Sequence, residues 1–385
     1  MKILFISNII GKRVGSFAMA SIRAAHKLGL EYHMAANFLN CSPDQRRIDE
    51  EEYGIRIHHV DIMRNPAHIG NLKAYRQITE LVKREKIDFI HCNTPIGGVL
   101  GRMAGQACGV KRIIYQAHGF HFYQGAPAIN WTLYYPVEKQ LARKTDALIT
   151  INREDYERAR KFRLRGNGTV YYVPGVGIDL SQYQFDTEKR ALKRRELGLR
   201  DTDIAVITTG ELISRKNYET AIKAIAETGD PRVHYFICGQ GILHEKLERL
   251  AGDLAAESHI HFLGFRTDVI LLLMAADIFL FTSFQEGLPR AVSEAMAVGL
   301  PCVASSIRGN TDLIEDGDNG FLYRPADAHG FSEGIRMLAG DPELRSRFSD
   351  RSRDRIKAFS LEEVTNAICS IYRNELFGEK TANGQ

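Results

Sequence analysis

Short apolar runs alternate with longer amphipathic stretches along almost the whole chain, and this alternation limits the possible folds more than any other feature. In the first half, six apolar runs predict strands at 2–7, 31–37, 88–93, 111–118, 147–152 and 169–174. The stretches between them predict helices at 16–28, 71–85, from Pro95 onward, and at 130–143. Strands that alternate with helices at this spacing form parallel βαβ units. The pattern therefore predicts a doubly wound α/β lobe.

The turn-rich segment VPGVGID (173–179) interrupts the alternation, which then resumes. Strands are predicted in the second half at 204–210, 233–239, 260–264, 277–283 and 301–306. Helices are predicted there at 187–197, 217–228, 242–256, 267–275 and 290–298. A length of 385 residues suits two domains. We predict lobes at 1–178 and 179–358.

The end of the chain is predicted to leave the second lobe. Ser360-Leu-Glu-Glu363 has the pattern of a capping box, with serine as N-cap and glutamate at the third helical position. We expect it to open an amphipathic helix within 359–377 that returns to the first lobe. The remaining residues, 378–385, are predicted to be disordered.

Composition excludes several protein classes. The six cysteines include no C-x-x-C pair, so we expect reduced thiols rather than a zinc cluster or disulfide framework. The longest apolar stretch, 269–281, is interrupted by Asp277 and is far shorter than the roughly 20 residues that span a bilayer. The start of the chain lacks the features of a secretory signal. We expect a cytoplasmic protein, with peripheral contact to the inner membrane face as an option.

Charge is divided unequally along the chain. Residues 1–180 carry 26 Lys and Arg against 16 Asp and Glu, a net charge of +10, whereas residues 181–385 carry 25 against 31, a net charge of −6. The basic half favours an anionic partner such as a lipid-linked phosphate or a membrane face. Nucleic acid is the weaker option because no nucleic-acid-binding motif is present. Charge that serves solubility alone remains the alternative.

One predicted helix combines aromatic and basic residues, as helices that lie on membrane surfaces do. Its aromatic and basic members are Trp131, Tyr134, Tyr135, Lys139, Arg143 and Lys144. The basic run 153–165 would add to it. Packing of the aromatic side chains in the core is the alternative.

The segment TSFQEGLPRAVSEAMAVGLPCVAS (282–305) combines a strand end, a helix start and two carboxylates. Glu286 follows a predicted strand, and Gly287-Leu288-Pro289 opens a predicted helix, where the missing N–H of proline costs nothing. Glu294 lies eight residues after Glu286, roughly two helical turns. Both carboxylates could accept hydrogen bonds from sugar hydroxyls, and the exposed amides at the helix start suit a phosphate. The alternative is a pair of glutamates on a solvated helix.

This segment resembles the E-x7-E signature of retaining glycosyltransferases of family 4, and the resemblance covers residues 2–376. It implies the GT-B fold, an α/β fold with two doubly wound Rossmann-like lobes that face each other across a cleft. The first lobe would bind the acceptor and the second the nucleotide-sugar. The resemblance further implies that Glu294 binds the donor ribose, that Glu286 contacts the donor sugar, and that the amides of Gly287 and Leu288 face the sugar and diphosphate.

The segment GELISRKN (210–217) resembles the family's G-R-L-x-x-x-K-G sequence, whose arginine and lysine neutralise the donor diphosphate. Lys216 matches the lysine. Glu211 departs from the pattern, since many members have arginine there, and Arg215 is the candidate for the second charge. Two solvated cations are the alternative, although cations at a helix start oppose its dipole unless an anion binds there.

The remaining site residues also follow from the resemblance. His118, at the end of the predicted fourth strand, corresponds to a histidine near the reacting carbon, and His121 competes for that role. YQAHGFHFYQGAP (115–127) resembles the exopolysaccharide and capsule branch of the family. Gly15 matches a Gly-rich loop beside the donor diphosphate. The backbone groups of Phe265 and Arg266 match a turn that contacts the nucleobase.

Three motifs are interpreted as unrelated to function. Asp201-Thr-Asp203 looks like a metal-binding D-x-D but precedes a strand, away from any ligand edge. The acidic stretch 316–320 resembles a calcium loop but has Phe321 where glycine is required. Gly239-Gln-Gly241 is half a dinucleotide fingerprint and is interpreted as a tight turn.

The resemblance implies transfer of a sugar from a nucleotide-sugar, with a uracil base expected, to a lipid-diphosphate-linked saccharide, with retained configuration and without a metal or other cofactor. Lys216, Glu286 and His118 are the expected catalytic residues. Two alternatives remain: a nucleotide-sugar 2-epimerase on the same scaffold, and a non-catalytic nucleotide-sugar-binding partner of another glycosyltransferase.

Overall fold

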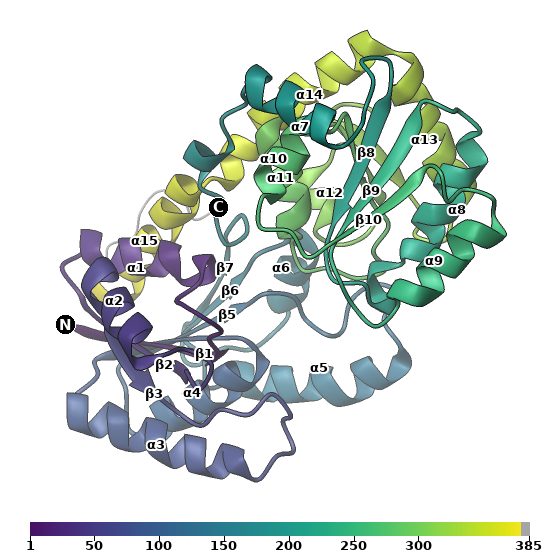
Figure 1. Ribbon diagram of the computed structural model, residues 1–385. Coiled ribbons are helices and arrows are strands. Elements are labelled where there is room, and N and C mark those ends of the chain that lie inside the picture. The colour runs from purple at the N-terminus through teal and green to yellow at the C-terminus, as the bar shows by residue number, and fades with distance from the viewer. Residues whose placement is uncertain (379–385) are drawn as a thin grey trace. The chain divides into compact units, whose positions relative to one another are not determined.

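The computed structural model describes residues 1–378, which form two compact units (Figure 1). The first unit contains Met1–Gly177 and the chain from Leu361 onward, and the second contains Ile178–Ser360. The boundaries predicted from the sequence are residues 178 and 358. Of the tail predicted to be disordered, only Gly378 is among the described residues.

A sheet of seven parallel strands forms the centre of the first unit, in the order β3-β2-β1-β4-β5-β6-β7. The strands are β1 (Lys2–Ile9), β2 (Glu31–Asn37), β3 (Arg56–His59), β4 (Phe89–Asn93), β5 (Arg112–Ala117), β6 (Ala147–Thr150) and β7 (Thr169–Tyr172). The order reverses between β1 and β4, the position at which ligands bind such sheets.

Strand β3 and the helix before it, α2 (Pro43–Tyr53), were not predicted from the sequence. The strand RIHH is short, lies at the sheet edge and has no apolar run. As a correction, the strand before His118 is therefore the fifth of its unit, and it ends at Ala117.

Helices cover the sheet of the first unit. They are α1 (Met19–Lys27), α2 (Pro43–Tyr53), α3 (Gly70–Glu85), α4 (Pro95–Ala107), α5 (Ala128–Ala142), α6 (Arg153–Ala159) and α15 (Leu361–Phe377), with a 3-10 turn η1 (Ser16–Ala18). The helix predicted at 16–28 is therefore divided into η1 and α1. Helix α15 packs against α1, and its Tyr372 hydroxyl lies 2.7 Å from Nδ1 of the buried His91 on β4.

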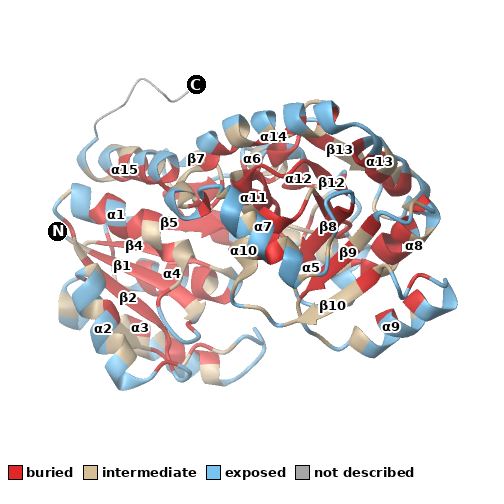
Figure 2. Cartoon of the chain, turned by 45° about the horizontal axis from the view of Figure 1, so that its top comes forward, coloured by how far each residue is buried: buried red, intermediate tan, exposed pale blue. Residues whose placement is uncertain are grey.

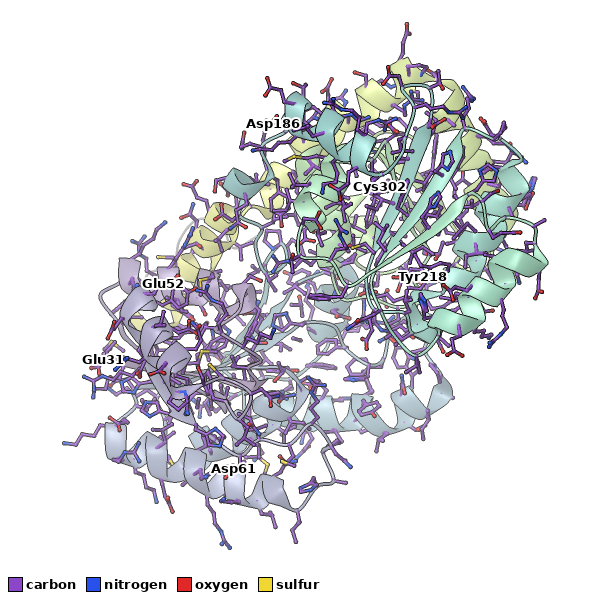
Figure 3. All side chains as sticks on the ribbon, viewed as in Figure 1. Glu31, Glu52, Asp61, Asp186, Tyr218 and Cys302 are labelled. Carbon is purple, nitrogen blue, oxygen red and sulfur yellow. The ribbon has the colours of Figure 1, made fainter. Side chains whose placement is uncertain are left out.

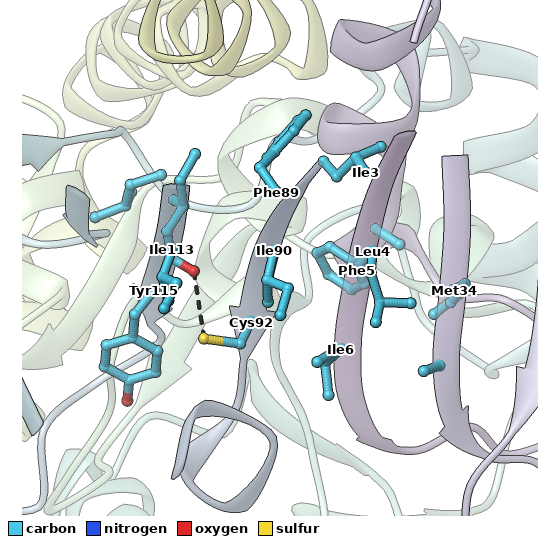
Figure 4. Packing of buried hydrophobic residues seen from close by; sticks show 14 of the residues in the cluster. Ile3, Leu4, Phe5, Ile6, Met34, Phe89, Ile90, Cys92, Ile113 and Tyr115 are labelled. Carbon is cyan, nitrogen blue, oxygen red and sulfur yellow. Dashed lines mark hydrogen bonds between the residues drawn. The ribbon is translucent and has the colours of Figure 1, made fainter. Parts of the chain in front are cut away.

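The inner strands of this sheet are largely buried on both faces, as the red colour of β1, β2 and β4 in Figure 2 shows, whereas the edge strands β3 and β7 are only partly buried. Ile3 and Phe5 of β1 pack beside Phe89 and Ile90 of β4, and all four are fully buried (Figure 4). Burial of each such side chain contributes about 1.5–3 kcal/mol. Because both faces are covered, the strands are continuous apolar runs, which explains why most were visible in the sequence.

The second unit has a six-stranded parallel sheet in the order β10-β9-β8-β11-β12-β13. The strands are β8 (Ile204–Thr209), β9 (Val233–Cys238), β10 (Ile260–Gly264), β11 (Ile278–Phe281), β12 (Cys302–Ser305) and β13 (Gly320–Tyr323). Cys302 is labelled at the start of β12 in Figure 3. The order of this sheet reverses between β8 and β11.

The helices of the second unit are α7 (Thr187–Glu196), α8 (Tyr218–Thr228), α9 (His244–Asp253), α10 (Val269–Ala275), α11 (Arg290–Val298), α12 (Asn310–Leu313), α13 (Ala328–Gly340) and α14 (Pro342–Ile356). Short 3-10 turns are η2 (Leu180–Tyr183), η3 (Ser214–Lys216) and η4 (Lys357–Phe359). Asp186, labelled in Figure 3, caps α7 by accepting from the Lys189 amide at 3.0 Å. No helix among residues 1–378 is long and apolar enough to cross a membrane.

Replacement of the buried tyrosine of α15, Tyr372→Phe, is expected to lower the free energy of unfolding by about 1–3 kcal/mol, because it removes the hydroxyl beside His91 Nδ1. Urea denaturation followed by circular dichroism measures this change. Tyr323→Phe, in the second unit, is the matched control. Equal effects of the two substitutions would show that the Tyr372 hydroxyl does not anchor α15.

Candidate functional site

The carboxyl ends of β8 and β11 bring together two segments singled out in the sequence. Arg215 and Lys216 lie in η3 after β8, and Glu286 follows β11. Backbone bonds join the two loops: the Phe284 amide donates to the Arg215 carbonyl at 2.9 Å, and the Ser283 hydroxyl donates to the same oxygen at 3.1 Å. Because the strand order reverses here, the segments meet where open α/β sheets bind ligands.

One carboxylate oxygen, Oε1 of Glu286, connects the two loops at this sheet edge. Glu286 Oε1 accepts from Lys216 Nζ at 2.8 Å, from Arg215 at 2.7 Å and from the Ser283 hydroxyl at 2.8 Å. The Lys216 and Glu286 side chains are mostly buried. Two cations share this one acidic partner, so the cluster carries an excess of positive charge. Such a cluster is suited to a second anion.

The segment after Glu286 offers hydrogen-bond donors. Among residues 1–378, the amides of Gly287 and Leu288 donate to no protein acceptor. Helix α11 spans Arg290–Val298, the predicted range, and Pro289 is its N-cap rather than a residue of its first turn. Free amides beside a helix start bind anions well.

Arg308 and Gly309, which follow β12, contact the backbone of Glu286 and Gly287. The buried Arg308 donates through Nε to the Glu286 carbonyl at 2.9 Å. Gly309, with φ of 83°, approaches so closely that a Cβ would lie 2.4 Å from the Gly287 carbonyl oxygen. A side chain at position 309 would therefore displace the Gly287 and Leu288 amides.

Glycines also let neighbouring loops approach at the ends of β8 and β9. A Cβ on Gly239 would lie 1.8 Å from the Gly210 carbonyl oxygen, and Gly239 has φ of 159°. That same oxygen accepts a hydrogen bond from the hydroxyl of Tyr218, the α8 residue labelled in Figure 3, at 3.0 Å. The half-fingerprint Gly239-Gln-Gly241 therefore serves tight packing of these loops.

Glu294 lies within α11, and Oε1 accepts from the Tyr183 hydroxyl at 3.1 Å and from Arg290 Nε at 2.7 Å. Burial, and then the nearby Glu294 charge, raise the pKa of Tyr183 to about 12. Tyr183 thus remains a hydrogen-bond donor at neutral pH. The contact with η2, at the start of the second unit, orients the carboxylate.

The turn after β10 holds Phe265 and Arg266. The Phe265 ring is exposed. The Arg266 side chain donates to both carboxylate oxygens of Asp268, at 2.8 and 2.7 Å, and this pairing holds the pKa of Asp268 well below its usual range. The Arg266 guanidinium is therefore occupied by a structural ion pair, which leaves the backbone groups of the turn for a ligand. Glu211, the departure from the family pattern, is exposed.

The first unit holds Gly15 and His118 and is described by itself. Gly15 precedes η1 in the loop after β1. His118 follows β5, and burial lowers its pKa from 6.5 to about 4, so the ring is neutral at physiological pH. No residue in the described chain pairs with its buried Nε2 atom. His121, the competing candidate, stacks on Tyr134 with ring centroids 4.6 Å apart.

A pocket of about 420 Å³ lies at the carboxyl edge of this sheet and includes both histidines. Asn8 and Thr94 contribute to it from the ends of β1 and β4, and Arg64 lies on it from the loop before α3. One face of α5 forms a mostly apolar wall. Its polar groups gather near the strand ends, so the pocket is suited to a ligand with a polar head and an apolar remainder.

Two of the motifs interpreted as unrelated to function, Asp201-Thr-Asp203 and the stretch 316–320, lie away from both sites. Asp203 pairs with Arg200 at 2.8 Å before β8, at the amino end of the sheet. Residues 316–320 form a turn, closed by a 2.9 Å bond from the Gly317 amide to the Gly320 carbonyl. Across the described residues, no three His, Cys, Asp or Glu side chains are grouped to hold a metal ion. All six cysteines are free.

Comparison with known proteins decides the family. Residues 189–355 match the family model described as glycosyl transferases group 1, and residues 17–152 match the model described as glycosyl transferase 4-like. EpsD of Bacillus subtilis, which is named as a glycosyltransferase, is 34% identical over 378 residues, 96% of each chain. This chain belongs to the glycosyl transferases of group 1.

Two further relatives extend the comparison. An Escherichia coli enzyme named UDP-Gal:alpha-D-GlcNAc-diphosphoundecaprenol alpha-1,3-galactosyltransferase is 28% identical over 316 residues, 81% of each chain. The crystal structure of Anabaena HepE in complex with UDP and glucose matches with a TM-score of 0.79 at 21% identity, covering 97% of this chain and 100% of the other. The family and the α/β GT-B class predicted from the sequence are confirmed. The roles of individual site residues stay predictions.

Several residues of this candidate site were not found from the sequence. Arg308 and Gly309 follow β12 at the same sheet edge as Glu286, so their position after a strand was an available signal. Tyr183 has no local signal, because it reaches Glu294 across 111 residues of sequence.

The substitution Gly309→Ala is expected to destabilise the second unit by about 1–3 kcal/mol, because φ is positive, and to weaken nucleotide binding by displacing the Gly287 backbone. Gly317→Ala is the matched control: it has the same backbone strain, with φ of 79°, and no atom within 4 Å of the added Cβ. Thermal unfolding and nucleotide titration separate the two effects. Equal nucleotide affinity in both variants would contradict the role of Gly309.

The neutral state of His118 predicts an acid-sensitive fold. Between pH 6.5 and about 4 the unfolded chain binds a proton that the native ring does not, so stability falls as the pH falls through this window. His118→Asn is expected to reduce the slope of unfolding free energy against pH by up to about 1.4 kcal/mol per pH unit. Urea titrations across this range measure the slope. Identical slopes for the variant and the wild type would refute the shift.

Proposed function

We propose that this chain transfers a sugar from a UDP-sugar to a lipid-diphosphate-linked saccharide of a bacterial exopolysaccharide or capsule, with retained anomeric configuration and without a metal. The observation that carries the proposal is the Glu286 cluster. Lys216 and Arg215 share one carboxylate oxygen, at 2.8 and 2.7 Å, beside the free amides of Gly287 and Leu288. This arrangement is suited to a diphosphate.

In the proposed reaction, the bond between the anomeric carbon and the diphosphate oxygen breaks through an oxocarbenium-like transition state. The electron pair stays on the leaving phosphate. Lys216, Arg215 and the amides of Gly287 and Leu288 stabilise the charge that develops there, which makes electrostatic stabilisation the main catalytic effect. The acceptor hydroxyl attacks on the same face and gives its proton to the leaving phosphate, so no protein nucleophile is required.

The other predicted residues take positioning roles in this proposal. Glu294, oriented by Tyr183, accepts hydrogen bonds from the ribose hydroxyls. The turn at Phe265 and Arg266 presents backbone groups to the uracil, and Glu286 contacts the donor sugar. Gly15 lets the first loop approach the donor. His118, neutral because of its burial, forms a hydrogen bond to the donor sugar without adding charge.

The acceptor is assigned to the pocket of the first unit. Its polar groups, Asn8 and Thr94, suit saccharide hydroxyls, and the exposed Arg64 side chain suits a phosphate. Support for a lipid-linked acceptor comes from the galactosyltransferase relative, which is named for transfer to a diphosphoundecaprenol-linked sugar. The HepE crystal structure, named for its complex with UDP and glucose, supports the uracil donor.

The first test is nucleotide binding by Glu294→Ala, measured by isothermal titration with UDP, GDP and ADP. Loss of the carboxylate is expected to weaken UDP binding by about 1–3 kcal/mol, the scale of a hydrogen bond to a charged group. Glu248→Ala, an exposed glutamate of the same unit, is the control. Unchanged UDP affinity would rule out the ribose role, and tighter binding of GDP or ADP would overturn the donor base.

The second test is turnover by Lys216→Ala with a UDP-sugar and a lipid-linked acceptor. Transfer is expected to fall about 100-fold or more, because a preorganised charge at the leaving group is lost. Lys246→Ala removes an exposed lysine paired with Glu219 and should leave the rate unchanged. Wild-type turnover by Lys216→Ala would refute the diphosphate role. Conversion of the donor sugar into another sugar in the absence of acceptor would indicate an epimerase. Binding of the donor without any reaction would indicate a non-catalytic partner.

A further inference from the structure

Helix α5 presents two different faces. Trp131 and Tyr135 turn inward and pack around the buried Phe122, with ring centroids 5.8 and 5.2 Å from it. Of the aromatic residues expected on a membrane-binding face, these two therefore pack against the core and are partly buried. The outward face instead carries Ile129, Leu133 and Val137, whose exposed fractions are 63%, 52% and 47%.

The three exposed aliphatic residues form one stripe. They are four residues apart, so at about 100° per residue they fall within about 80° of the helix circumference. Lys139 and Arg143 project on the other side of Ile129, at about 80° and 40° from it by the same geometry. The outward face is thus an aliphatic stripe with a basic flank. Helices of this kind lie in the interfacial region of membranes.

The charge of this face is entirely positive. Glu138 is the only acidic residue of α5, and it turns inward to a bidentate ion pair with the fully buried Arg102 on α4. In the described part of the chain, neither Lys139 nor Arg143 pairs with a carboxylate. Ordinary surface helices carry mixed charges, whereas this face matches an anionic surface.

The stripe is continuous with the pocket that holds His118. Leu133 and Val137, together with Tyr134, form its apolar wall. An exposed apolar patch of this kind marks an interaction site rather than an ordinary surface. A saccharide in the pocket would therefore have its attached lipid next to the stripe.

We propose that the outward face of α5, namely Ile129, Leu133 and Val137 with Lys139 and Arg143, docks the first unit on an anionic lipid bilayer. The aliphatic side chains enter the interface, and the two cations bind the lipid phosphates. The consequence for a lipid-linked acceptor rests on the proposed function: docking places the pocket at the bilayer, where such an acceptor resides. The docking itself is independent of catalysis.

The test measures binding of the full chain to vesicles of phosphatidylcholine with and without phosphatidylglycerol, by co-sedimentation. We expect the wild type to bind the anionic vesicles in preference. The triple variant Ile129→Ser, Leu133→Ser, Val137→Ser should bind about tenfold more weakly or worse. Lys139→Gln and Arg143→Gln should each weaken binding to the anionic vesicles about fivefold at low salt. The matched control replaces Ile48, Leu192 and Ile242, exposed aliphatic residues outside α5, by serine.

Weaker vesicle binding by a variant can also result from misfolding. A second experiment therefore measures a gain, the fluorescence quenching of an added tryptophan. Leu133→Trp should show fluorescence quenching by vesicles with brominated acyl chains beyond that of Trp131, the one native tryptophan, whereas Leu192→Trp should not. Any one of three results would overturn the proposal: the wild type shows no preference for anionic vesicles, the triple and control variants bind equally, or Leu133→Trp shows no added quenching. A triple variant that changes only the oligomeric state would also overturn it and assign the face to a second copy.

Activity separates this inference from the proposed function. The variant Ile129→Ser, Lys139→Gln, Arg143→Gln, whose residues do not line the pocket, should retain transfer to a water-soluble short-chain acceptor and lose transfer to the acceptor embedded in anionic vesicles. Absence of transfer to both acceptors by the wild type would refute the proposed function and leave the vesicle assay as a valid test of docking. Equal losses on both acceptors by this variant would contradict docking as the role of the outward face of α5.

Discussion

The Glu286 carboxylate is the interaction on which the arrangement of the second unit's site depends. Its Oε1 atom accepts from Lys216, Arg215 and Ser283, residues of two loops that are about 70 positions apart in sequence. Without an acidic partner, two adjacent cations would repel each other and turn to solvent. With it, they are held at the sheet edge and keep an excess positive charge. A ligand phosphate can therefore complete the cluster without rearrangement, which is the condition for electrostatic catalysis.

Close backbone approach provides the second constraint. Gly239 lies against the Gly210 carbonyl and Gly309 against the Gly287 carbonyl, in each case closer than any Cβ would permit. These contacts bring the loops after β8, β9, β11 and β12 to one edge of the sheet. The approach of Gly309 to Gly287 also fixes the backbone beside the amides of Gly287 and Leu288. The first unit uses its sheet edge differently, with a pocket walled by α5 and a neutral His118.

Much of the fold was predictable because both sheets are parallel and covered on both faces. Strands such as β1 and β4 must then be apolar throughout, and this leaves a plain signal in sequence. Strand β3 was missed because an edge strand with the sequence RIHH needs no apolar run. Of the site, Glu286, Glu294, Arg215 and Lys216 were predicted from short motifs after strands. Tyr183 was not, because its contact with Glu294 joins positions 111 residues apart, and Arg308 was not, although its position after β12 was an available signal.

The sequence by itself determined the fold class, the family and the residues that follow the strands, since periodicity and turn chemistry are local properties. Only the tertiary structure decided how those residues pair and which face of a helix remains in contact with solvent. Helix α5 illustrates the difference: its composition is apolar on both sides, so periodicity could not orient it. Packing of Trp131 and Tyr135 around Phe122 buried the aromatic face and left the aliphatic stripe outside. The physical reason is that burial depends on neighbours far away in the chain, whereas propensity depends on adjacent residues.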